Sequence, residues 1–227
     1  MPRQAANGIT EATGRKPREE RWLQIMKAAA EVFYEKGYDA ATLQDIADRV
    51  GILKGSIYYY IRTKDDLLDS LLIEVNKEGL EMIRGCAAAP GNIFDKIETM
   101  IRGHVAYMCS NQAKTSVYLH ELKALDRSRR ETLFEPHAFR DEFLTLIKQG
   151  QREGLILLEL DEKMTAQSML GWINSLYQWY RPQSRKPQRV VADHFVTMIT
   201  RGIATDKGLE RNEIWLNRLG IPNGRVF

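Results

Sequence analysis

The stretch TLQDIADRVGILKGSIYYYIRTKDDLL, residues 42–68, decides the fold of this 227-residue chain. Thr42, with Asp45 three residues later, forms a capping-box pattern that predicts the start of a short helix. Gly51 can take the left-handed conformation that ends a helix, so a second short helix over residues 54–61 can leave at a steep angle. Two short helices joined in this way predict a helix-turn-helix.

The residues of this stretch divide into a small core and an outward face. Ala47 is small at the point where the two helices would cross. The expected core residues are Ile46, Val50, Ile52 and Ile57. The outward residues of the second helix comprise a cation, several hydroxyl groups and a glycine without a side chain. This combination suits contact with base edges and phosphates in a DNA major groove. These outward residues are Lys54, Gly55, Ser56, Tyr58, Tyr59 and Tyr60.

Helical signals continue on both sides of the helix-turn-helix. Pro17 suits the first turn of a helix, and apolar residues from Trp22 onward recur at spacings of three and four. Thr63 with Asp66 repeats the capping pattern and predicts the start of a longer helix. Residues 1–16 carry Pro, Gly and charges without apolar periodicity, so we expect a flexible basic arm there.

The pattern stays helical beyond residue 85. Asn92 with Asp95, and Ser128 with Glu131, are expected helix starts. The sequence LILLEL, residues 155–160, is the one strand candidate. A lone strand has no pairing partner, so we expect a loop at this point.

Two later segments, residues 161–180 and 187–204, are apolar or aromatic on much of their circumference. A helix with one face in water would not need this pattern, so we expect both to be buried on more than one side. The tail after residue 206 is charged and contains glycine.

The excess positive charge lies in the first quarter of the chain. Residues 1–64 contain 11 Lys and Arg and 8 acidic residues. The difference, three positive charges, equals the formal net charge of +3 for the whole chain. A basic N-terminal region suits a polyanionic partner. The sequence contains no apolar run of membrane-spanning length and no secretion signal, so we expect a cytoplasmic protein without membrane contact. Cys86 and Cys109 lack disulfide or zinc spacing, and no metal or cofactor is expected.

Residues 42–68 resemble the DNA-binding segment of the tetracycline-repressor (TetR) family. The resemblance is carried by Thr42, Ile46, Ala47, Gly51, Ile52, Gly55, Ser56, Ile57, Tyr58, Tyr60, Ile61, Thr63, Lys64 and Leu67. Two positions depart from the family pattern: Tyr60 stands where the family usually has His, and Ile61 where it usually has Phe. The first departure changes a position near the DNA, and the second changes the packing of the small core.

The resemblance implies roles for individual residues at the DNA. Thr42 and Tyr58 are implied to contact phosphates. Lys54 and Gly55 are implied to approach bases, and Lys64 to contact the DNA backbone. The implied protein is a dimeric repressor that binds a palindromic operator and is released by a small effector.

A second resemblance lies in GWINSLYQWYRP, residues 171–182, and YLHEL, residues 118–122. Both are similar to the TetR branch that senses acyl-CoA thioesters, which implies an effector of that class. The candidate ligand-binding residues are His104, Tyr107, Met108, Tyr118, Glu121, Trp172, Asn174, Tyr177 and Arg181. Arg181 has two interpretations, because it suits either a CoA phosphate or the C-terminal end of a helix.

Dimerisation is expected on physical grounds, because one recognition helix reads few bases, whereas two spaced about 34 Å apart read a palindrome. In the TetR branch, long C-terminal helices of two subunits pair into a four-helix bundle. Gly171 and Ser175, four residues apart, would allow close backbone approach. The residues expected on the matching apolar face are Val191, Phe195, Met198 and Ile199.

Together these patterns predict an all-α protein of about nine helices. It comprises an N-terminal three-helix DNA-binding domain with a helix-turn-helix and a C-terminal helical domain for ligand binding and dimerisation. The expected boundaries are 1–16 for the flexible basic arm, 17–64 for the DNA-binding domain, 65–206 for the ligand-binding and dimerisation domain, and 207–227 for the tail.

The enzyme motifs that we considered are incomplete or absent in this sequence. His120 and Glu121 lack the second His of HExxH, GILKGS lacks P-loop spacing, and no GxSxG occurs. We therefore expect that the protein is not an enzyme. A DNA-binding class without a ligand domain would leave about 140 further helical residues unexplained. The remaining alternative is a helical ligand-binding or protein-interaction module that does not bind DNA.

Overall fold

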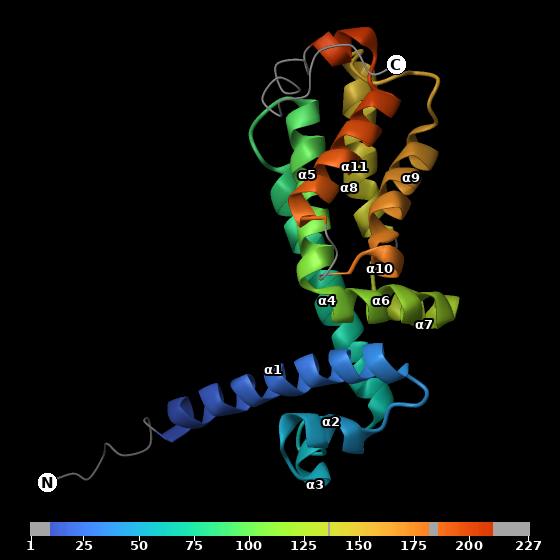
Figure 1. The fold of residues 1–227 in the computed structure, drawn as a ribbon. Coiled ribbons are helices and arrows are strands. Elements are labelled where there is room, and N and C mark those ends of the chain that lie inside the picture. Colours follow the sequence, from blue (N-terminus) through green and yellow to red (C-terminus); the bar gives the residue numbers. More distant parts are fainter. Residues whose placement is uncertain (1–9, 136, 182–185, 211–227) are drawn as a thin grey trace, which may run out of the picture. The chain divides into compact units, whose positions relative to one another are not determined.

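The computed structural model describes residues 10–135, 137–181 and 186–210, with the side chains described from residue 17 onward (Figure 1). Within these ranges the chain is helical, and its only β-type pairing is one isolated antiparallel bridge between Ile156 and Ala204. None of the helices in the described ranges has the length and apolar character to cross a membrane.

The described residues form eleven helices, against about nine expected. The helices are α1 Thr10–Lys36, α2 Leu43–Val50, α3 Lys54–Ile57, α4 Lys64–Ala87, α5 Ile93–Ser110, α6 Gln112–Ala124, α7 Arg127–Leu133, α8 Ala138–Arg152, α9 Glu162–Asn174, α10 Leu176–Trp179 and α11 Gln188–Ile203.

The chain divides into two compact units. The first comprises residues 1–75 and 113–133, so it contains α1, α2, α3, the first part of α4, and nearly all of α6 and α7. The second comprises residues 76–112 and 134–227, with the rest of α4 and helices α5 and α8 to α11. These units follow spatial contact, whereas the domains expected from the sequence were contiguous.

Helix α1 begins earlier than expected. It starts at Thr10 rather than at Pro17, so residues 10–16 are helical and the expected flexible arm does not extend over them. Residues 1–9 of that arm lie outside the described residues. A proline removes one backbone donor, and helix α1 continues through that gap in its hydrogen-bond ladder.

The first unit has its core beneath the helix-turn-helix. Ile46, Ile57 and Leu67 are fully buried, from α2, α3 and α4 respectively. Gly51 adopts a left-handed conformation with φ 74°, and the N–H of Ile52 then donates to the carbonyl of Ala47 at 3.0 Å. The turn predicted from the glycine is therefore confirmed.

The second short helix is shorter than the predicted 54–61. Helix α3 covers Lys54–Ile57, and the next three residues form a turn in which the N–H of Tyr60 donates to the carbonyl of Ile57 at 2.8 Å. Such tight turns are common at helix ends, where carbonyls lack helical partners.

Helix starts are confirmed at two of three predicted positions outside the helix-turn-helix. The N–H of Asp66 donates to Thr63 at 3.0 Å, and Asn92 forms a full capping box with Asp95. The third start is wrong. Helix α7 begins at Arg127, where Asp126 accepts from the N–H of Arg129 at 2.9 Å, because a carboxylate is as good an N-cap as Ser128.

The second unit has α5 at its centre, against α11, α8, α9 and α10. Ile97 and Ile101 of α5, Phe143 of α8 and Ile199 of α11 are fully buried. Residues 155–160 form the expected loop, and the amide of Gln151 donates to two of its carbonyls at 2.9 Å each.

The expectation that 161–180 and 187–204 are buried on more than one side is not met within the chain. Met164 and Trp172 of α9 are 71% and 45% exposed, and Val190 and Met198 of α11 are also exposed. Each helix buries one face in its own unit, so the additional apolar residues remain at the surface.

Candidate nucleic-acid interface

Helix α3 presents a short polar and aromatic surface to solvent. Tyr59 is 80% exposed and Tyr58 51% exposed, while Ile57 is completely buried. Lys54 is exposed, and a side chain added at Gly55 would meet nothing within 4 Å. The buried isoleucine therefore anchors α3 while its neighbours remain available to a partner.

Leu53, which precedes α3, belongs to this surface although the sequence did not single it out. It is 81% exposed and occupies the N-cap position of α3 without a side-chain cap. An exposed leucine beside a lysine suits apolar contact with a thymine methyl group. The available signal was that Leu53 stands outside the apolar set that forms the small core.

Tyr60 lies differently from the other two tyrosines. It is half-buried, and its ring stacks on Trp22 of α1 with centroids 6.4 Å apart and planes at 18°. The residue was expected on the outward face with Tyr58 and Tyr59. Because the turn after α3 rotates the chain, Tyr60 instead joins the end of that turn to α1.

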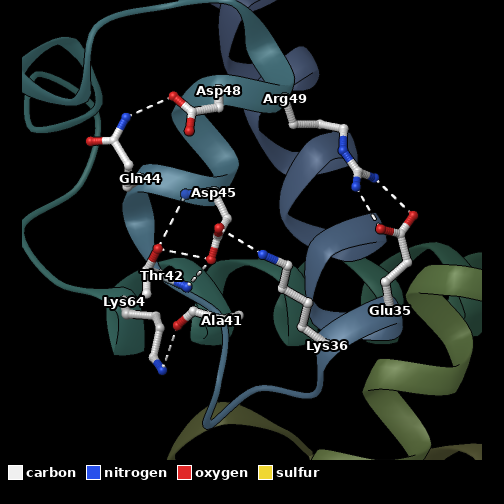
Figure 2. A network of polar contacts seen from close by, with 9 residues as sticks. All are labelled: Glu35, Lys36, Ala41, Thr42, Gln44, Asp45, Asp48, Arg49 and Lys64. Atoms are coloured by element: carbon white, nitrogen blue, oxygen red, sulfur yellow. Dashed lines mark hydrogen bonds and ion pairs between the residues drawn. The ribbon is translucent and has the colours of Figure 1, made fainter.

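Thr42 fixes the start of α2 (Figure 2). Its hydroxyl accepts from the N–H of Asp45 at 3.2 Å and donates to the Asp45 carboxylate at 2.8 Å. Lys36 donates to the same carboxylate at 2.7 Å. The bond from Lys36, followed by those from Thr42, lowers the pKa of Asp45 to about 2, so the carboxylate is ionised at neutral pH. The predicted capping box is confirmed.

The ammonium of Lys64 is directed into the protein. It donates to the backbone carbonyls of Tyr38, Asp39 and Ala41 at 2.8, 3.1 and 3.0 Å, the last of which is drawn in Figure 2. An ammonium has three donors, so these bonds occupy all of them. Lys64 therefore joins α4 to the loop before α2, and the DNA contact implied for it stays a prediction.

A second tie joins α2 to α1. Arg49 donates to Glu35 at 2.9 and 2.5 Å (Figure 2). It also donates to Glu31 at 3.4 Å. The bond to Glu35, which is the larger cause, raises the pKa of the Arg49 guanidinium. The paired acids neutralise this cation, so α2 is held in place and its positive charge is not free for DNA.

His104, one of the expected ligand-binding residues, lies on α5 in the second unit and is buried. Burial lowers the pKa of His104 to about 4, against a smaller opposing effect of its hydrogen bond with Asn174. Its Nδ1 is buried without a hydrogen-bond partner among the described residues. The ring centroids of His104 and Phe139 are 6.4 Å apart. The imidazole is therefore neutral at pH 7 and has one unused polar atom.

Tyr107 lies near the same cluster. Its hydroxyl donates to Glu78 of α4 at 2.9 Å. A side chain added at Gly79 would meet both Phe139 and Tyr107, so the two rings border the same point of α4. Met108, the next candidate on α5, is buried.

Comparison with known proteins fits this architecture. Residues 25–71 match the bacterial regulatory proteins of the tetR family, and residues 90–203 match the tetracyclin repressor-like C-terminal domain. The chain belongs to the TetR family. The first match contains the helix-turn-helix, and the second contains His104, Tyr107 and Phe139.

Individual relatives of this TetR-family regulator are distant but cover most of it. The transcriptional repressor KstR2 of Rhodococcus jostii is 23% identical over 187 residues, which are 82% of this chain and 92% of the repressor. The structure of the ketosteroid regulator KstR2 of Mycobacterium tuberculosis has a TM-score of 0.75 at 23% identity, covering 82% of this chain and 96% of that one. The structure of AibR with isovaleryl coenzyme A and operator DNA has a TM-score of 0.70 at 22% identity, covering 78% and 97% respectively.

The remaining ligand candidates of the TetR-family regulator lie on α6, α9 and α10 and directly after α10. Tyr118 and Glu121 belong to α6 in the first unit, where burial raises the pKa of Tyr118 to about 12. Trp172 is exposed, and Tyr177 accepts from the amide of its neighbour Gln178 at 3.0 Å. Arg181 donates to the Tyr180 carbonyl at 2.9 Å, which favours its interpretation as a helix-end residue.

Glu78 and Phe139 are the cluster members that sequence reasoning missed. Glu78 carried a detectable signal, since it lies three residues after Val75 and four before Met82, within the apolar stripe of α4. A carboxylate at such a position marks a polar site in otherwise apolar surroundings. Phe139 gave no such signal, because an apolar residue near the start of a helix is ordinary.

The residues expected at the dimer interface divide into two groups. Gly171 and Met198 are exposed, and Ser175 is half-buried. Val191, Phe195 and Ile199 are already buried within the single chain. Their apolar face packs inside the protomer, and the subunit contact stays a prediction.

Proposed function

We propose that this TetR-family regulator is a ligand-responsive transcriptional repressor that binds a palindromic operator as a dimer. The observation that carries the proposal is the outward surface of α3, where Tyr58 and Tyr59 are 51% and 80% exposed beside the exposed Lys54. A buried Ile57 holds the helix while hydroxyls and a cation remain free to contact base edges and phosphates. A module that does not bind DNA would have no use for this arrangement.

A dimer supplies the second recognition element that a palindrome requires. The exposed apolar residues of α9 and α11 include Met164, Trp172, Val190 and Met198. Exposed apolar surface of this kind suits contact with a second subunit. Gly171 adds a point where a second backbone can approach, because no atom lies within 4 Å of a side chain added there. We assign the subunit contact to this surface.

The effector is assigned to the cluster around His104. The Nδ1 atom of the neutral, buried His104 imidazole has no hydrogen-bond partner among the described residues, so it can accept a hydrogen bond from a ligand atom or donate one to it. The adjacent pair of Tyr107 and Glu78 adds further polar groups. An acyl-CoA thioester fits because its carbonyl oxygen accepts hydrogen bonds and its acyl chain suits the rings of Phe139 and Tyr107. The isovaleryl coenzyme A in the AibR structure supports this class.

We assign the release from DNA to a shift of helix α4. This helix carries Glu78 beside the effector cluster and Lys64 at its first residue, where the ammonium holds the loop before α2. An effector that favours a shifted α4 would move that loop and change the spacing of the two recognition helices. Reversing a 99:1 preference needs about 5.5 kcal/mol of differential binding, which two effector sites in a dimer can share.

The test uses the full-length protein and an operator selected from random duplexes. We expect fluorescence anisotropy to give binding to a palindromic duplex at least 1000-fold tighter than to a random duplex, as is typical of specific regulators. A panel of acyl-CoA thioesters should release the protein from the selected duplex without being hydrolysed. Failure to select any sequence would contradict the DNA-binding function and favour the non-DNA module.

A further inference from the structure

A groove lies between the early part of α1 and the end of α3, within the first unit. It is lined by Pro17, Arg18 and Arg21 from α1 and by Ser56, Tyr59 and Tyr60 from α3 and its turn. Figure 1 shows α1 running past α2 and α3, so the early turns of α1 accompany the recognition helix. The groove is therefore continuous with the surface that α3 offers to DNA.

The two arginines of the groove are free to bind an anion. Arg18 and Arg21 are three residues apart, which places them on the same side of α1. Neither forms an ion pair with any residue that the structure describes. Glu19 and Glu20 stand between them in the sequence, but adjacent helical positions point in different directions.

A neighbouring groove on the same helix is lined by Arg21, Lys27, Glu31 and Arg49, among others. Its Arg49 is already paired with Glu31 and Glu35. The groove that contains Tyr59 has two cations and no acidic residue in its lining, so we assign the anion preference to it.

The geometry of the groove is fixed by an aromatic stack. Trp22 of α1 and Tyr60 after α3 have ring centroids 6.4 Å apart and nearly parallel planes, so the early turns of α1 are held against the end of α3. Arg18 and Arg21 precede residue 25, where the match to the family begins. They therefore lie outside the matched segment.

We propose that this groove holds the sugar-phosphate backbone of the operator beside the major groove that α3 enters, an inference that depends on the proposed function. Each guanidinium can make paired hydrogen bonds to phosphate oxygens, and the hydroxyls of Ser56 and Tyr59 can donate to the same strand. Two such contacts in each protomer give four in a dimer. They strengthen binding to any duplex and carry no sequence information.

The experiment compares the full-length protein with the double variant Arg18→Gln, Arg21→Gln. Anisotropy titrations against the selected operator and a random duplex, at salt concentrations from 50 to 200 mM, give the slope of log affinity against log salt. Loss of four phosphate contacts per dimer should flatten this slope by about 3 to 4 on both duplexes. The affinity gap between the two proteins should then narrow by about 100-fold across the range.

Two control variants separate charge and position. Arg18→Lys, Arg21→Lys keeps both charges and should retain most of the slope. Lys148→Gln, Arg152→Gln removes two charges from α8 in the second unit and should leave the slope unchanged. Thermal unfolding of each variant should match the starting protein, because Arg18 is exposed and Arg21 half-exposed.

The possible outcomes distinguish this inference from the proposed function. If the unaltered protein binds the operator and the Gln double variant keeps its slope, the backbone groove is wrong while operator binding stands. If the slope changes only on the selected operator, the arginines read bases and the backbone assignment is overturned. If the unaltered protein binds no duplex, both proposals fail.

Discussion

Lys64 and Tyr38 are joined twice: the Lys64 ammonium donates to the Tyr38 carbonyl at 2.8 Å and lies 4.4 Å from the centre of the Tyr38 ring. The hydroxyl of Tyr38 in turn donates to Asp65, the residue after Lys64. Burial, followed by this bond, raises the pKa of Tyr38, so the phenol stays protonated. The loop between α1 and α2 is thereby tied to the start of α4.

Replacing Lys64 by Met should destabilise the DNA-free protein. The apolar side chain keeps the length but leaves three backbone carbonyls without their donor, which costs about 1 to 3 kcal/mol in the free energy of unfolding. Urea unfolding measures this loss, with Lys77→Met on the exposed side of α4 as the control. Unchanged stability together with a flatter salt slope for DNA binding would instead return Lys64 to the phosphate backbone.

Replacing Lys54 by Ala should relax sequence preference without affecting the fold. The side chain is exposed at the start of α3, so the free energy of unfolding should change by less than about 0.5 kcal/mol. The preference for the operator over a random duplex should fall by about 1 to 3 kcal/mol, as expected for loss of a base contact. An equal weakening on both duplexes would mean that Lys54 contacts a phosphate.

Acid should weaken the fold through His104. The pKa of this side chain is about 4 in the folded chain, against an ordinary value of 6.5. Between these values the unfolded chain takes up a proton that the folded chain excludes, so stability falls as pH is lowered through this window. From pH 7 to pH 5 the loss should be about 2 kcal/mol per protomer.

Two measurements check the His104 prediction. His104→Gln should remove this part of the pH dependence while leaving that of the other groups. In the unaltered protein, NMR titration should find the imidazole still neutral at pH 5. A midpoint near 6.5 would mean that solvent reaches the ring, contrary to its burial.

Replacing Gly171 by Leu should separate the subunits. A Cβ atom added at this position meets nothing within 4 Å in the protomer, so the fold of one chain should tolerate a side chain there. In a close helix contact the same side chain would hold the backbones apart, and the dissociation constant of the dimer should rise at least tenfold, a change of about 1.4 kcal/mol. Sedimentation velocity measures this constant. Gly85→Leu is the matched control, because that glycine is equally open on α4, and equal behaviour of the two variants would place the interface elsewhere.

Features set by neighbouring residues could be predicted from the sequence. The capping boxes at Thr42 and Asn92 and the left-handed turn at Gly51 depend on atoms a few residues apart, and all are present. The helix start predicted at Ser128 was wrong because Asp126, two residues earlier, is an equally good N-cap. Local chemistry predicts that a helix starts nearby, and the surrounding contacts choose between adjacent caps.

Features set by distant residues could not be predicted in the same way. An apolar stripe indicates that Phe195 packs, but not whether it packs on α5 or on a second subunit. Lys64 shows the same limit, because the sequence does not reveal that its ammonium reaches three backbone carbonyls of a distant loop. The cluster at His104 required Glu78 and Phe139, from two other helices, to come together in space.

The four-residue length of α3 has a consequence for how such a regulator changes during evolution. Only Ile57 of this helix is buried, so its other positions contribute little to the free energy of unfolding. Substitutions at Lys54 or Gly55 can therefore alter which DNA sequence is recognised while the protein remains folded. The recognition surface can diversify after gene duplication almost independently of the scaffold, and it can be exchanged by design to direct the same effector response to a new promoter.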